Sequence, residues 1–252
     1  MKEGRPNRAR RTETGIALLI SIFILLLISV IAIGLIISSG TESALAANYR
    51  SSTAVYYAAL SGLEEARSRL LATNPSSFHN TSPGFLPSPG VTMAIGSVAY
   101  VLNPSPEPSL NEHQGNLQAL YPDTEYDSEF GAGALAAANA ASTVKITPSV
   151  WNTSPLNSVN GTMGGPLYKW VRINPVSETA LKLDVSPFDT VQDPLKPVFY
   201  DGVRLNDTNS GHQVFEITSL ATLPNGSRKL LQYLVAALPS TYKIVSFHEI
   251  SQ

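Results

Sequence analysis

The stretch Arg10-Arg11-Thr12-Glu13-Thr14-Gly15, followed by IALLISIFILLLISVIAIGLII at residues 16–37, decides the fold of this 252-residue chain. The second part is 22 residues of almost purely aliphatic character, and no charged residue occurs between Glu13 and Glu42. As an α-helix it is roughly 33 Å long, which matches the hydrocarbon core of a bilayer. The sequence therefore predicts one membrane-spanning helix over residues 16–37.

The leader, residues 1–15, is basic, with five cationic residues (Lys2, Arg5, Arg8, Arg10 and Arg11) against Glu3 and Glu13. Positive charge beside a span favours the cytoplasmic side, so everything after the span is predicted to be exported. A cleavable secretory signal is the alternative, with Ala44-Leu45-Ala46 as a possible cleavage triplet. Its apolar core is usually only about 7–15 residues, which favours a span here.

The helix is predicted to continue to residue 73, because residues 38–73 contain no proline and Asn74, which precedes Pro75, is disfavoured in a helix. An apolar stripe follows at helical spacing: Val55, Ala59, Leu63, Ala66 and Leu70. The charged residues around the stripe are expected to face water: Glu64, Glu65, Arg67 and Arg69. The first half of such a helix must be surrounded by a membrane or by other apolar helices, and its second half must pack on a globular domain.

A basic leader ending in Gly15, followed by such a two-part helix, resembles the type IV pilin family and its pseudopilin relatives. The resemblance implies that a prepilin peptidase cuts after Gly15 and frees Ile16 as the new amino terminus. It also implies that the helix lies in a bacterial inner membrane before assembly, and then packs with other pilin and minor pilin subunits in a filament.

Further residues resemble the PilX-type minor pilins over about the first 70 residues: the Gly15-x-Ala17-Leu18-Leu19 opening, Glu42, Asn48-Tyr49-Arg50, Ala58 and Gly62-Leu63-Glu64. By this resemblance Ile20, Glu42, Asn48, Tyr49 and Arg50 are expected to act in assembly. Most pilins carry glutamate at the position of Ile20. A carboxylate in an apolar core is costly without a positive partner, so its loss fits a subunit with no neighbour above it, at the filament tip.

Two other functions remain open at this stage. The K-type pseudopilin of type II secretion shares the architecture, but its large helical insert has no predicted counterpart here. A signal-anchored envelope binding protein, which never enters a filament, is the alternative from a different class.

Residues 74–252 are predicted to form one exported domain, which makes the chain an α+β protein with an antiparallel sheet packed on the helical stripe. Residues 91–95 and 97–102 flank Gly96 like a hairpin, and residues 167–173 (LYKWVRI) alternate as a strand. The clearest hairpin joins residues 213–223 and 228–238 through Pro224-Asn225-Gly226-Ser227.

Residues 103–141 are predicted to form a long surface loop, since prolines punctuate its start and small residues fill 131–141 (GAGALAAANAA). Acidic residues alternate within it: Asp123, Glu125, Asp127 and Glu129. They are a weak candidate for a Ca²⁺ site, but the EF-hand glycine and bidentate glutamate are missing. A solvated acidic loop is the preferred interpretation.

Composition excludes several functional classes. The net charge is −2 with 14% charged residues, so no basic face for nucleic acid is expected. Cysteine is absent, and His79, His113, His212 and His248 lie in separate segments without metal-ligand spacing. We expect no enzymatic activity and no cofactor.

Overall fold

The computed structural model describes residues 10–71, 74, 77–78, 86, 91–103, 123–140, 144–150, 167–186, 191–238 and 241–250. The chain divides into two units, Met1–Ser51 and Ser52–Gln252. Helix α1 (Arg10–Arg69) supplies residues to both units and ends four residues before the predicted limit at residue 73. The first part of the predicted leader, residues 1–9, lies outside the described residues.

The second unit is built on a mixed sheet of eight strands. The order is β2-β1-β3-β6-β4-β5, and β7 pairs with both β6 and β8. The strands are β1 (Val98–Leu102), β2 (Val144–Pro148), β3 (Tyr168–Pro175), β4 (Phe199–Tyr200), β5 (Leu205–Asn206), β6 (His212–Thr222), β7 (Arg228–Ala237) and β8 (Tyr242–Ile250). The short helices are α3 (Thr124–Phe130), α4 (Ala134–Ala140) and α7 (Glu178–Leu181).

The predicted α+β class is confirmed, but the prediction of a wholly antiparallel sheet is wrong. β1 and β2 pair in parallel, with Val98 opposite Val144 and Leu102 opposite Pro148. The other named strand pairs are antiparallel. The chain passes through α3 and α4 between β1 and β2, and a crossover of this length is what a parallel pair requires.

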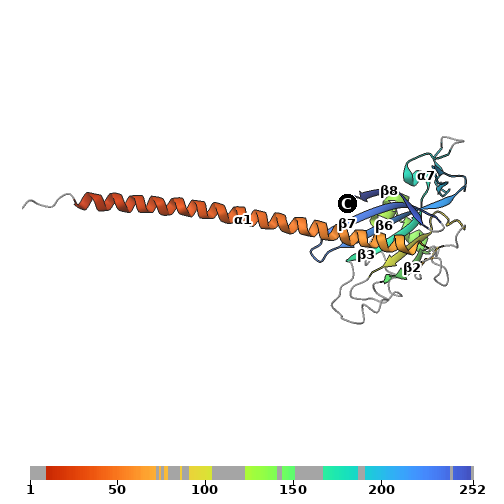
Figure 1. Ribbon diagram of the computed structural model, residues 1–252, viewed down its shortest axis with the longest axis horizontal. Helices are drawn as coiled ribbons and strands as arrows, with labels where there is room; N and C mark the ends of the chain where they lie inside the picture. The colour runs from red at the N-terminus through yellow and green to blue at the C-terminus, as the bar shows by residue number, and fades with distance from the viewer. Residues whose placement is uncertain are drawn as a thin grey trace, which may run out of the picture. The chain divides into compact units, whose positions relative to one another are not determined.

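The C-terminal turns of α1 lie across one face of the sheet, beside β3, β6 and β7 (Figure 1). The predicted stripe is confirmed as the contact, because all its members are buried: Val55, Ala59, Leu63, Ala66 and Leu70. Gly62 allows close approach at this point. A Cβ atom there would lie 2.5 Å from Ser219 Oγ and 2.8 Å from Val171 Cγ2, distances that a packed interface does not permit.

The prediction that all four charged residues of this helix half face water is wrong for two of them. Glu65 is 8% exposed and Arg69 is 4% exposed. Glu64 and Arg67 lie nearer the rim and pair with each other. The buried surface of α1 is therefore wider than the apolar stripe, and it includes an ion pair.

A register shift in β3 changes the predicted alternation of its side chains. The shift lies between Tyr168 and Trp170, where β3 pairs with β6. It places Tyr168 in the same core cluster as Val171 and Ile173, on the α1 side, while Trp170 joins the cluster on the other side. An extra residue in one strand of a pair has this effect, because side chains otherwise alternate strictly between faces.

The two predicted hairpins have different outcomes. β6 and β7 form the predicted hairpin, and Gly226 in its turn has φ of +85°. The predicted hairpin around Gly96 is wrong, because residues 91–94 form no strand and only the second segment forms one, β1. Met93 is instead held through its backbone, whose N–H donates to Gln213 Oε1 at 2.8 Å and whose carbonyl accepts from Gln213 Nε2 at 2.7 Å.

The prediction of a surface loop over residues 103–141 is wrong for residues 123–140, while residues 104–122 lie outside the described part. α3 and α4 cover the sheet face opposite to α1. Their buried side chains are Tyr126, Leu135 and Ala138, which pack with Tyr100, Trp170 and Leu220. Small residues can therefore line a helix that packs closely on a sheet.

Candidate functional site

The first unit consists of a helix whose apolar side chains are exposed. Every residue from Gly15 to Arg50 is exposed in this structure. This is the one helix among the described residues that is long and apolar enough to cross a membrane. Its most apolar 18-residue window has a mean hydropathy of 3.3, and none of that window is buried. Such a surface is unfavourable in water and requires an apolar host.

The polar groups within this apolar helix are satisfied internally. Ser21 Oγ donates to the carbonyl of Ala17 at 2.8 Å, and Ser29 Oγ donates to that of Leu25 at 2.8 Å. Backbone and hydroxyl groups that are bonded within the helix can enter a hydrocarbon environment at low cost.

The residues predicted to act in processing and assembly all lie on α1. Gly15, Ile16 and Ile20 belong to the apolar half, and Ile20 is 51% exposed. Glu42, Asn48, Tyr49 and Arg50 follow on the exposed helix surface before residue 52. The structure thus shows these side chains as exposed, and their role in assembly stays a prediction.

A buried polar network fixes the C-terminal end of α1 to the sheet edge. Glu65 Oε1 accepts from Arg69 Nη1 at 3.2 Å and from the backbone N–H of Val150 at 2.9 Å. Glu65 Oε2 accepts from Ser149 Oγ at 2.8 Å and from the hydroxyl of Tyr168. Burial, and then the Glu65 carboxylate, raise the pKa of Tyr168 well above its ordinary value, so its hydroxyl remains a donor.

Three residues of this network also line a surface hollow of about 430 Å³ along α1. The lining consists of Tyr57, Leu60, Ser61, Glu64, Glu65, Ser68, Arg69, Asn74 and Val150. Both carboxylate oxygens of Glu65 already accept internal hydrogen bonds. These contacts indicate that the network anchors the helix to the sheet.

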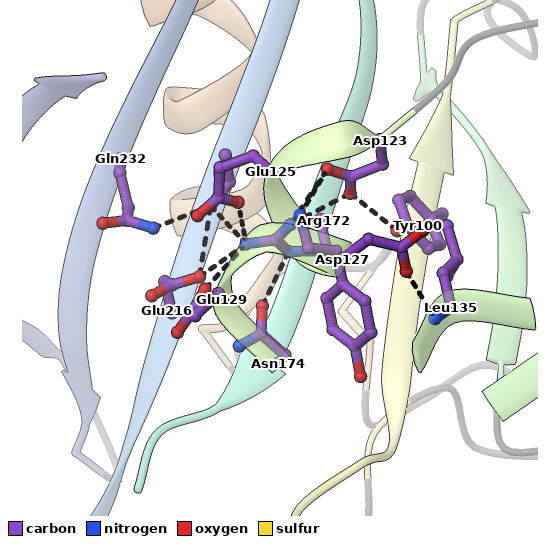
Figure 2. Close-up of polar contacts among 12 residues, drawn as sticks. Tyr100, Asp123, Glu125, Asp127, Glu129, Leu135, Arg172, Asn174, Glu216 and Gln232 are labelled. Atoms are coloured by element: carbon purple, nitrogen blue, oxygen red, sulfur yellow. Dashed lines mark hydrogen bonds and ion pairs between the residues drawn. The ribbon is translucent and has the colours of Figure 1, made fainter. Parts of the chain in front are cut away.

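The second polar cluster lies on the opposite face of the sheet, around Arg172 of β3 (Figure 2). The Arg172 side chain is completely buried. Its Nη1 donates to both carboxylate oxygens of Asp123 at 3.1 and 3.0 Å, and its Nε donates to Asn174 Oδ1 at 2.9 Å. Its Nη2 donates to Glu216 Oε1 at 2.7 Å.

The acidic partners of Arg172 come from two different elements. Glu125 and Glu129 project from α3, with Oε2 atoms 2.6 Å and 3.5 Å from Arg172 Nη2, while Glu216 comes from β6. Asp123 caps α3 by accepting from the backbone N–H of Tyr126 at 3.1 Å, and it also accepts from the Tyr100 hydroxyl at 2.7 Å. The cluster thus joins α3 to β1, β3 and β6.

These contacts contradict the interpretation of the four acidic residues as a solvated loop. Asp123 is 2% exposed and caps a helix, and Asp127 Oδ1 accepts from the backbone N–H of Leu135 at 2.9 Å. Glu125 and Glu129 are partly buried against Arg172. The alternating spacing does not reveal a helix, although in a helix residues 125 and 129 lie on one face.

Burial and neighbouring charges shift the ionisation of this cluster. Burial alone would lower the pKa of Arg172, but Asp123, Glu216 and Glu125 together raise it well above its ordinary value. Burial, followed by the Glu216 carboxylate, raises the pKa of Glu129 to about 9. The pKa of Glu125 is also raised, mainly by burial.

Three of the carboxylates lie near one another, beside the Arg172 guanidinium. Oxygen atoms of Glu125, Glu129 and Glu216 all lie within 4.8 Å of one another. The predicted metal set therefore changes: Glu216 joins it, while Asp123 and Asp127 are engaged elsewhere. Neither His212 nor His248 belongs to the group, and His79 and His113 lie outside the described residues.

No protein-family model, curated protein or solved structure matches the chain.

Proposed function

We propose that this protein is a minor pilin of the PilX type, a non-enzymatic subunit that lies in a bacterial inner membrane and then enters a type IV pilus. One observation carries the proposal: α1 exposes an apolar surface from residue 15 to beyond residue 37 and buries a stripe against the sheet from Val55 to Leu70. A single helix with these two halves suits a subunit that exchanges a membrane for a bundle of apolar helices.

The leader and the apolar half of α1 act at different steps, before and during assembly into the filament. The basic leader stays in the cytoplasm and is removed after Gly15 by a prepilin peptidase. The apolar half first lies in the membrane and then packs against other pilin subunits, while the sheet domain remains exported. Ser21 and Ser29 suit both the membrane and a bundle of apolar helices, because each hydroxyl donates to a backbone carbonyl of α1 and is not left unpaired.

Position near the filament tip is supported by Ile20. A subunit within the shaft has neighbours above and below, whereas a tip subunit lacks the upper one. An unpaired carboxylate in that apolar surrounding is costly, so an aliphatic side chain at this position suits the tip. The subunit would then begin assembly together with a few other minor pilins, and few copies would suffice.

Deleting the gene in its own bacterium should lower the number of surface filaments far more than their length, because initiation and not elongation is lost. Electron microscopy of negatively stained cells measures both quantities. Immunogold against the exported domain should label filament ends in the parent strain. Label along the whole shaft would contradict the tip position, and a normal number of unlabelled filaments would favour an envelope protein outside the filament.

A further inference from the structure

The cluster around Arg172 contains more carboxylate oxygens than one guanidinium can satisfy. Two of the five N–H groups of Arg172 belong to Nη2. Four oxygens surround that nitrogen: Glu125 Oε2 at 2.6 Å, Glu216 Oε1 at 2.7 Å, Thr218 Oγ1 at 3.2 Å and Glu129 Oε2 at 3.5 Å. Glu125 Oε2 is buried and lies outside hydrogen-bond geometry despite its short distance.

The remaining donors of Arg172 are already engaged. Nε donates to Asn174, and Nη1 donates to both oxygens of Asp123. Four carboxylates, from Asp123, Glu125, Glu129 and Glu216, therefore meet one positive charge in a buried location. Like charges at such distances in a region of low dielectric constant strongly disfavour full ionisation.

We propose that Glu129 carries a proton at neutral pH and donates it in a hydrogen bond to the Glu216 carboxylate, and that this bond keeps α3 docked on the sheet. The proton supplies one further hydrogen-bond donor to a cluster whose carboxylate oxygens outnumber the N–H groups that Arg172 can offer them. It joins a carboxyl group of α3 to one of β6, so its loss places two negative charges on opposite sides of the interface. α3 should then separate from the sheet before the sheet itself unfolds.

Among the described residues, the other groups that face this pair supply no second positive charge. α3 contributes Asp123, Glu125, Tyr126 and Asp127, while β1 contributes Tyr100 and β3 contributes Arg172. β6 adds Thr218, and β7 adds the neutral Gln232, whose Nε2 donates to Thr218 Oγ1 at 3.2 Å. Next along the sheet is His248 of β8, opposite Gln232 and exposed. α4 has no titratable side chain.

The direction of the pH effect follows from the pKa of Glu129, which burial and Glu216 raise from 4.5 to about 9. Between these two values the folded chain holds a proton that the unfolded chain releases. Stability must therefore fall as the pH rises through this window. The raised pKa of Glu125 acts in the same direction.

The test compares the full-length chain with Glu129→Gln in mild non-ionic detergent between about pH 5 and pH 9. The wild-type melting temperature should fall by about 5 °C or more across this range. Glu129→Gln carries a permanent amide donor, so its melting temperature should change much less and should exceed that of wild type at pH 9. Glu64→Gln, a change at a half-buried residue of α1 on the other face of the sheet, should keep the wild-type profile.

Two measurements on the wild-type chain keep the proposal testable if Glu129→Gln folds poorly. Infrared spectra at pH 7 should contain the band of a protonated carboxyl group. After correction for intrinsic rates, hydrogen exchange of residues 124–130 should accelerate at pH 9 more than that of the β6–β7 hairpin. Absence of the band, or parallel acceleration of both segments, would overturn the proposal. A rise in melting temperature with Mg²⁺ or Ca²⁺ at pH 8, lost in Glu129→Gln, would show that a cation takes the place of the proton.

Discussion

Replacing Arg172 with leucine should unfold the sheet domain or lower its stability by about 3–5 kcal/mol, the range for breaking a buried ion pair by removing one partner. Asp123 and Glu216 would each keep a buried carboxylate without its guanidinium partner. A loss of this size is a large part of the total stability of an ordinary domain. Thermal melts followed by near-ultraviolet circular dichroism measure the change.

Arg204→Leu is the matched control for this prediction. The Arg204 side chain is 69% exposed and lies 3.7 Å from Asp201, and exposed pairs of this kind contribute little to stability. The damage from Arg172→Leu should also lessen near pH 4, where protonation removes the unpaired charges. Equal melting temperatures for the two leucine variants would mean that the guanidinium does not organise the domain.

Leu63→Asp should destabilise the same domain by more than about 3 kcal/mol, through a lost core side chain and a stranded carboxylate. Leu63 is fully buried between α1 and the sheet, one residue after the close contact at Gly62. Fluorescence-monitored unfolding in urea, with the full chain in detergent, gives the change in the free energy of unfolding.

Ala54→Asp provides the comparison on the same helix, because Ala54 is exposed and receives the same new side chain. The free energy of unfolding should fall there only by the difference in helix propensity between alanine and aspartate, about 0.7 kcal/mol. If both aspartate variants unfold at the same urea concentration, the stripe from Val55 to Leu70 is not the interface that holds α1 on the sheet.

The sequence predicts the parts of this fold that depend on local periodicity. The stripe on α1 repeats at helical spacing, and the Asn225-Gly226 turn joins two strand-like runs, so both were predicted correctly. The sequence does not predict the parallel β1–β2 pair, because the pair depends on a crossover through α3, which is rich in acidic residues, and α4, which is rich in alanine. Pairing between distant segments leaves little local signal.

The buried polar residues could not be predicted for a related reason. Glu65 lies largely off the apolar stripe, which predicts that it faces water, and its partners Ser149 and Tyr168 lie far away in the sequence. The acidic residues before Phe130 were recognised, but nothing in the sequence pairs them with Arg172 and Glu216. An arginine inside the strand-like run 167–173 was the only available signal.

The most direct test of the central claim is the amino-terminal sequence of the mature protein, recovered from the membrane of the cells that naturally produce it. A pilin-like subunit cut after Gly15 must begin at Ile16. Gly15→Val should block the cut, because the peptidase requires a small residue there, and should leave the leader attached. A wild-type protein that begins at Met1 or Lys2, or at a residue beyond Ala44, would contradict the account.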